Sequence, residues 1–213
     1  MRLYSKIGMS VFAIFVLSVC VWKFLPQFWA GAVYPLKYET SIKKYAEQYK
    51  FDPNFVAAVI FTESTFNADS VSYVGARGLM QIMPSTASWI ATQVDEPNYT
   101  ANKLFEPDVS IKFGCFYLRD LADDFGGNID LALAAYNAGS GSVRSWQRLN
   151  PDNPLQYSSS VSGYVNKINK TKTMYDKIYG NWYIAQQTIT AAPAKPWYTL
   201  PSIWIGNVIG TNK

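Results

Sequence analysis

Helix-start signals and helical spacing of apolar residues cover almost the whole chain beyond Pro35, which restricts it to a mostly α-helical fold. Asp52 can cap free backbone N–H groups and Pro53 suits a first helical position, while Asn128 can cap a later helix in the same way. No pair of strands and no internal repeat is recognisable. The apolar spacing predicts helices over 40–49, 52–65, 84–94, 107–125, 129–136, 142–149 and 162–179.

Residues 1–35 differ from the rest because they are almost entirely apolar. The run from Ile7 to Trp22 is interrupted only by small residues and is flanked by Lys6 and Lys23. A helix over residues 3–25 would cover a bilayer core of about 30 Å, so we predict an N-terminal transmembrane helix. A cleaved signal peptide, with a small-residue site at residues 30–32, is the alternative; the apolar run is longer than the usual core of about 7–15 residues. In either case the positive residues stay inside, and the remainder is exported across the membrane.

Composition excludes several classes of chemistry. The chain has no histidine, which removes Ser-His-Asp and Cys-His catalysis as well as His-ligated zinc. Its two cysteines are far apart, which excludes a Cys-based metal site as well, and we expect Cys115 to be a buried small residue. We expect no metal and no cofactor. Removing the three basic residues of positions 1–35 from the 19 leaves 16, against 15 acidic residues. Because the main body is nearly neutral, we expect no nucleic-acid partner.

Glu63 is an acid where the pattern of its helix predicts a core residue. Phe55, Val56, Val59 and Ile60 have the spacing of one buried face, and Glu63 follows Val59 by four residues. Burial raises the pKa of a carboxyl, which lets it hold a proton near neutral pH, as a general acid must. A solvated Glu at a fraying helix end is the alternative that this pattern alone leaves open.

Three segments together resemble a known family. They are Glu63-Ser64-Thr65-Phe66-Asn67, then Ser72 followed by residues 75–84 (Gly-Ala-Arg-Gly-Leu-Met-Gln-Ile-Met-Pro), then residues 135–141 (Ala-Tyr-Asn-Ala-Gly-Ser-Gly). Their joint occurrence in this order, over about residues 37–180, resembles the catalytic domain of the soluble-type (family 1) lytic transglycosylases. The resemblance implies a lysozyme-like (goose-type/SLT) helical domain.

The resemblance also implies site residues, residue by residue. Glu63 matches the single catalytic acid of the family. The matches to substrate-lining positions are Ser72, Gln81, Met83, Tyr136 and Asn137, and Tyr164 matches a tyrosine that hydrogen-bonds the acid. The family usually has Glu-Thr-Arg shortly before that tyrosine, whereas this chain has Ser160-Val161-Ser162, so the support around Tyr164 departs from the pattern.

The resemblance implies an enzyme that cleaves the β-1,4 bond between N-acetylmuramic acid and N-acetylglucosamine in peptidoglycan without water. Glycosidases commonly need two carboxylates, and no second acid has a setting like that of Glu63. A goose-type lysozyme-like hydrolase and a non-catalytic glycan-binding module are the alternatives. We predict an anchor or signal segment over 1–35, the catalytic domain over 36–180 and an aromatic, proline-rich tail over 181–213, with peptidoglycan and, through residues 1–35, the membrane as partners.

Overall fold

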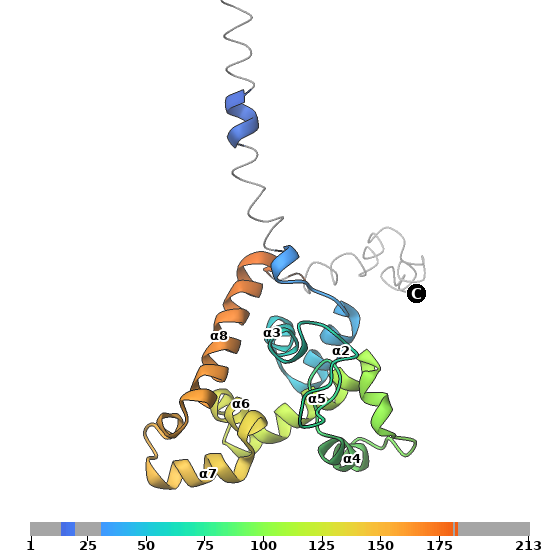
Figure 1. Cartoon of the computed structure of the whole chain (residues 1–213), viewed down its shortest axis with the longest axis vertical. Helices are drawn as coiled ribbons and strands as arrows, with labels where there is room; N and C mark the ends of the chain where they lie inside the picture. The colour runs from blue at the N-terminus through green and yellow to red at the C-terminus, as the bar shows by residue number, and fades with distance from the viewer. Residues whose placement is uncertain (1–13, 20–30, 181, 183–213) are drawn as a thin grey trace, which may run out of the picture. The chain divides into compact units, whose positions relative to one another are not determined.

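The computed structural model describes residues 14–19, 31–180 and 182 of the chain, and all the helices named here belong to one unit, Met1–Gly180. The mostly α-helical prediction is confirmed for these residues (Figure 1). The helices are α2 (Glu39–Tyr49), α3 (Pro53–Ser64), α4 (Pro84–Gln93), α5 (Pro107–Asp124), α6 (Ile129–Ala138), α7 (Ser140–Leu149) and α8 (Ser159–Tyr179), with short 3-10 helices at Ala101–Phe105 and Pro154–Tyr157 that the sequence did not predict.

The predicted membrane anchor falls mostly on residues 1–13 and 20–30, and the predicted tail on 181 and 183–213; these residues lie outside the described ones. Among the residues that the structure describes, no helix has the length and apolar character needed to cross a membrane.

Helix α3 lies at the centre of the fold, between α8 and α2 (Figure 1). Its start follows the prediction, since the Asp52 side chain accepts a hydrogen bond of 2.8 Å from the Asn54 N–H and Pro53 opens the helix. The prediction of a single buried face was wrong, because all eight residues from Pro53 to Ile60 are buried. A central helix has neighbours on all sides, so it is apolar all round rather than amphipathic. Only its last turn, which carries Glu63, reaches partly exposed positions.

Helices α3 and α8 run antiparallel, and polar contacts join them at both ends. Near the start of α3, the Asn54 side-chain amide donates to Asp176 (3.0 Å) and to the Gly180 carbonyl (2.9 Å) at the end of α8. At the other end, Tyr164 in the second turn of α8 donates to Glu63. Ser158 caps α8 by accepting from the Val161 N–H, so the helix begins three residues earlier than predicted. The divergent residues 160–162 therefore form its first turn.

Cys115 is fully buried within α5, as predicted.

Candidate active site

The loop between α3 and α4 carries much of the predicted site, and three helices hold it. The Ser64 hydroxyl of α3 donates to the Leu79 carbonyl (2.8 Å). The Met80 N–H donates to Ser110 Oγ of α5 (3.2 Å), and the Tyr136 hydroxyl of α6 donates to the Met80 carbonyl (2.6 Å). Buried backbone groups need such partners, so these bonds fix the loop relative to Glu63.

Two glycines allow this loop to approach the helices closely. Gly78 has φ of +75°, and a Cβ there would lie 1.9 Å from the Leu104 carbonyl oxygen, so no other residue fits. A Cβ at Gly114 of α5 would lie 2.2 Å from the Met80 sulfur. The position of the loop therefore depends on both glycines.

A cavity of about 340 Å³ opens where this loop meets the ends of α3 and α6. The structure places six of the seven predicted site residues on its wall and the seventh, Tyr164, in hydrogen-bond contact with Glu63. The lining residues are Glu63, Ser72, Val74, Ala76, Gln81, Met83, Tyr136 and Asn137. Sequence reasoning did not assign Val74 and Ala76 to the site, although both flank Gly75 at the start of the glycine-containing motif.

Glu63 is a carboxyl whose surroundings favour the protonated form on balance. Burial raises its pKa above the ordinary value, while the hydrogen bond from Tyr164 and the positive charge of Lys167 act to lower the pKa. Tyr164 Oη lies 2.5 Å from Glu63 Oε1. Burial and the charge of Glu63 hold the pKa of Tyr164 well above its ordinary value, so this hydroxyl stays a donor. The arrangement suits a group that first donates a proton and then takes one back.

The other predicted residues have distinct local roles. Gln81, with φ of +47°, donates its side-chain amide to the carbonyls of Ser70 (3.1 Å) and Gly78 (2.9 Å), so its nitrogen braces the loop. Ser72 Oγ accepts from the Ala76 N–H (3.0 Å) and closes the turn before the cavity. The Tyr136 hydroxyl donates to the Met80 carbonyl, so its oxygen can only accept a hydrogen bond from a substrate, and its ring is free to stack on one.

Met83 and Asn137 both have exposed side chains on the cavity wall, Met83 at the start of α4 and Asn137 in the last turn of α6. They are free to meet a ligand without rearrangement of the core.

Glu63 is the one carboxylate among the described residues that line this cavity. All 15 Asp and Glu residues of the chain fall within the described part, so the remainder holds no further acidic side chain. Asp69 is exposed in the loop between α3 and α4. Asp130 is also exposed and accepts a hydrogen bond of 3.0 Å from the Asn169 side-chain amide.

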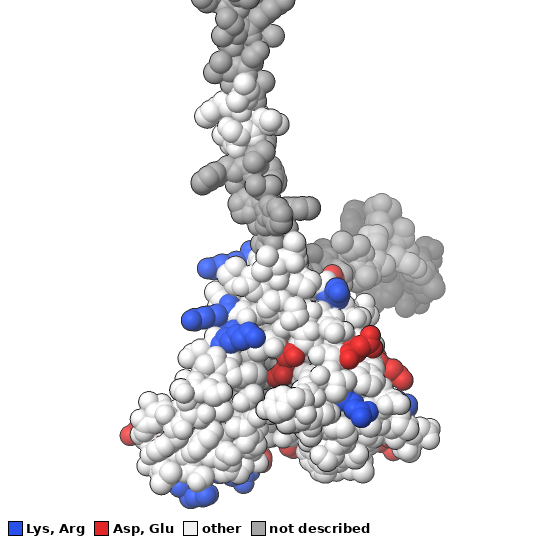
Figure 2. All heavy atoms as spheres, viewed as in Figure 1, with Lys and Arg blue, Asp and Glu red and all other residues white. Residues whose placement is uncertain are grey.

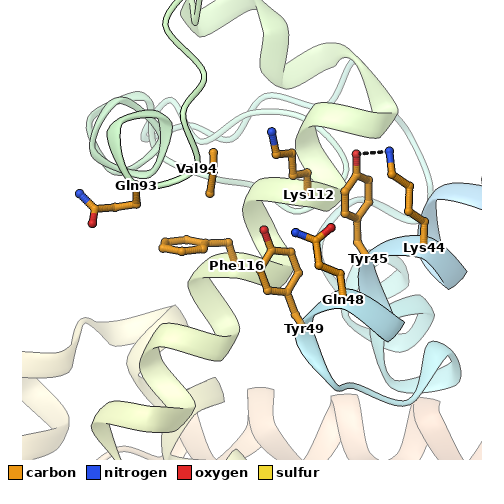
Figure 3. Close-up of a pocket in the computed structure, with 8 residues that line it drawn as sticks. All are labelled: Lys44, Tyr45, Gln48, Tyr49, Gln93, Val94, Lys112 and Phe116. Atoms are coloured by element: carbon orange, nitrogen blue, oxygen red, sulfur yellow. Dashed lines mark hydrogen bonds between the residues drawn. The ribbon is translucent and has the colours of Figure 1, made fainter.

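A larger cavity of about 560 Å³, between α2, α5 and the end of α4, has lysine and tyrosine side chains in its lining (Figure 3). Figure 3 shows the hydrogen bond that Lys44 donates to the Tyr45 hydroxyl, and Lys112 forms an ion pair with Glu96 at 3.1 Å. No carboxylate lines this cavity among the described residues. Within the described part of the chain, no cluster of His, Cys, Asp or Glu could hold a metal ion.

Known proteins resemble this chain in sequence and in fold. The soluble lytic murein transglycosylase of Escherichia coli (strain K12) is 38% identical over 114 residues, which are 53% of this chain and 18% of that protein. The membrane-bound lytic murein transglycosylase C of Histophilus somni (strain 2336) is 34% identical over 121 residues, covering 53% of this chain and 33% of the relative. This chain thus matches only about a fifth to a third of the length of these relatives.

The crystal structure of the 70-kDa soluble lytic transglycosylase of Escherichia coli superposes with a TM-score of 0.65 at 29% identity, over 75% of this chain and 29% of that one. This likeness confirms the predicted fold of the helical domain. The family described as "Transglycosylase SLT domain" matches residues 40–157. That match covers more than half of the sequence, and the chain belongs to the transglycosylase SLT domain family.

Proposed function

We propose that this chain is a peptidoglycan lytic transglycosylase that cleaves the β-1,4 bond between N-acetylmuramic acid and N-acetylglucosamine and leaves 1,6-anhydromuramic ends. The observation that carries the proposal is a single, largely buried carboxylate on a cavity wall that has no second one among the described residues. Ordinary hydrolysis needs a second group to activate water or act as nucleophile. The relatives' names, lytic murein transglycosylases, support the same reaction.

The proposed reaction uses Glu63 twice. Protonated Glu63 gives its proton to the glycosidic oxygen as the bond from C1 to that oxygen breaks, and the carbonyl oxygen of the 2-acetamido group bonds to C1. Glu63, now a carboxylate, removes the proton of the C6 hydroxyl of the same sugar. O6 then bonds to C1 and displaces the acetamido oxygen, so Glu63 is protonated again and no water is consumed.

A tethered nucleophile makes this reaction efficient. The C6 hydroxyl belongs to the sugar that is already bound, which gives it a large effective concentration relative to a diffusing water molecule. The hydrogen bond from Tyr164 stabilises the carboxylate form of Glu63 between the two steps. We propose that the ring of Tyr136 and the side chains of Ser72, Gln81, Met83 and Asn137 contact the sugars, because they line the same cavity.

The direct test is product release from purified peptidoglycan by the wild-type chain and by Glu63→Gln. The amide is near-isosteric but cannot transfer a proton, and loss of such transfer costs about 10²–10⁴-fold in rate. We expect Glu63→Gln to bind the polymer and to release almost nothing. More than about a tenth of wild-type turnover would remove Glu63 from the mechanism, since that exceeds what proton transfer allows.

We further propose that residues 1–35 attach the enzyme to the membrane, with 36–180 as the catalytic domain on the cell-wall side and 181–213 as a tail. The support is the apolar run between Lys6 and Lys23. The membrane-bound relative from Histophilus somni is consistent with this location.

A further inference from the structure

A second cavity, of about 540 Å³, lies between α8 and the last turn of α3, and we call it the α8 groove. Its lining shares no residue with the cavity at Glu63 and consists of Tyr34, Phe61, Gly163, Asn166, Lys167, Lys170, Thr171 and Met174. It combines an aromatic side with a basic side, which is the pattern expected for an anion that also carries apolar groups.

The aromatic side of the α8 groove is firmly built. The ring centroids of Tyr34 and Phe61 are 5.2 Å apart, and Tyr175 packs behind them at 6.1 and 6.2 Å. The hydroxyls of Tyr175 and Tyr179 each donate a 2.6 Å hydrogen bond, to the carbonyls of Pro35 and Tyr34. These contacts hold the segment that carries Tyr34 against α8, so this side of the groove is formed before any ligand arrives.

The basic side consists of Lys167 and Lys170, one turn apart on α8 and both exposed. Neither has an ion-pair partner among the described residues, and every Asp and Glu of the chain lies within them. By contrast, Lys172 of the same helix pairs with Asp52 (3.1 Å) and Asp176 (2.8 Å). Like charges at this spacing repel each other, so a bound anion would be stabilised by both. Lysine and arginine side chains gather over α8 on the face drawn in Figure 2.

The α8 groove is formed by the same two helices, α3 and α8, that carry Glu63 and Tyr164. Phe61 precedes Glu63 by two residues, and Gly163 precedes Tyr164, the hydrogen-bond partner of Glu63. Lys167 is close enough for its charge to act on the pKa of Glu63. Gly163 lines the groove, and a Cβ there would meet nothing within 4 Å, so this position can take a larger side chain without displacing its neighbours.

We propose that the α8 groove binds the peptide branch carried by the muramic acid of the glycan, with Lys167 and Lys170 contacting its carboxylates and Tyr34, Phe61 and Met174 its short apolar side chains. This inference rests on the proposed function, because that function brings a muramic acid to Glu63. The branch leaves the same sugar whose C1 reacts, so it must pass close to the catalytic acid. Its carboxylates match the unpaired lysines.

The test compares two soluble substrates: uncross-linked glycan strands that carry their peptides, and the same strands stripped by an amidase. We expect the wild-type chain to show a lower KM on the peptide-bearing strands. Lys170→Glu should raise KM on those strands about fivefold, the upper range for one exposed ion pair, and change turnover of stripped strands less than about twofold. Added salt should reduce the preference of the wild-type chain, because exposed charges are screened.

Three further variants separate the groove from general charge and from folding. Lys177→Glu makes the same charge change on α8 outside the groove and should leave the preference intact. Lys170→Arg keeps the positive charge and should retain the preference for peptide-bearing strands. Gly163→Leu should reduce it without a change of charge, since the added side chain enters open space in the groove.

Equal losses on both substrates, or no loss on either, would overturn the inference. The inference would also be overturned if Lys170→Glu lost only its sedimentation with phosphatidylglycerol vesicles and kept its KM on both substrates. That result would assign the lysines to a membrane surface. A wild-type chain that cleaves neither substrate would contradict the proposed function instead. In that event, binding of fluorescent strands to the Glu63→Gln chain still decides whether the groove selects the peptide.

Discussion

At the scale of single residues, the proposed chemistry depends on how the neighbours of Glu63 balance its protonated and deprotonated forms. Burial favours the protonated acid that the proposed bond cleavage requires, and Tyr164 with Lys167 favours the carboxylate that the proposed ring closure requires. Neither influence alone would serve a group that must act as both acid and base. The effect of each neighbour can therefore be measured as a change in the pKa of Glu63.

Replacing Tyr164 by Phe should shift the pH dependence of the enzyme. The lost hydrogen bond had stabilised the carboxylate, so the pKa of Glu63 rises further above its ordinary value. The alkaline limb of kcat/KM, where the acid becomes deprotonated, should move to higher pH while the maximal rate falls. Lys167→Gln should move the limb in the same direction. An unchanged limb in both variants would show that these groups do not act on Glu63.

Replacing Glu63 by Gln should stabilise the protein at neutral pH. Because the folded-state pKa of Glu63 is raised, the folded chain binds this proton more tightly than the unfolded chain. The contribution of Glu63 to stability is therefore fully present below its unfolded pKa and is lost as pH rises through the folded pKa. Glutamine does not titrate, so thermal unfolding should show a higher Tm for Glu63→Gln at pH 7 and a smaller difference at pH 4. A lower Tm at pH 7 would contradict the burial of the charge.

At the scale of elements, the site depends on how closely the loop before α4 packs on α5. Gly114→Ala would push a Cβ against Met80, whose backbone Ser110 and Tyr136 hold. Overpacking of this kind costs about 1–3 kcal/mol. We expect urea unfolding to show that loss and turnover to fall, because the displaced loop carries Gln81 and Met83.

The matched control is Gly163→Ala, a helical glycine whose Cβ would meet nothing within 4 Å. It should be neutral or stabilise by up to about 1 kcal/mol, since alanine favours helix more than glycine does. An equal loss of stability in Gly114→Ala and Gly163→Ala would contradict the close approach of Met80 to α5.

Caps and motifs made most elements predictable, because they act locally. Asp52-Pro53 and Asn128 predicted helix starts that the structure reproduces. The burial of α3 on all sides was not predictable, since it depends on which helices pack around it. The use of the Tyr136 hydroxyl to hold Met80 could not be foreseen either, because the two residues are 56 positions apart.

At the scale of the whole molecule, we propose that anchoring and catalysis are separable. A chain of residues 36–213 should cleave isolated peptidoglycan but should no longer sediment with membranes, because the apolar run between Lys6 and Lys23 is gone. The full chain serves as the control for membrane retention. Inactive, aggregated protein would place either the boundary or the anchor elsewhere, since Tyr34 and Pro35 also pack against α8.

The central claim is that one carboxylate suffices because the substrate supplies its own nucleophile. Digestion of peptidoglycan in oxygen-18 water, followed by mass spectrometry of the new muramic ends, tests it most directly. We predict 1,6-anhydro ends, lighter than the hydrolysis product by one water and free of the heavy oxygen. Reducing ends that carry oxygen-18 as the main product would contradict the account and assign the chain to the hydrolases.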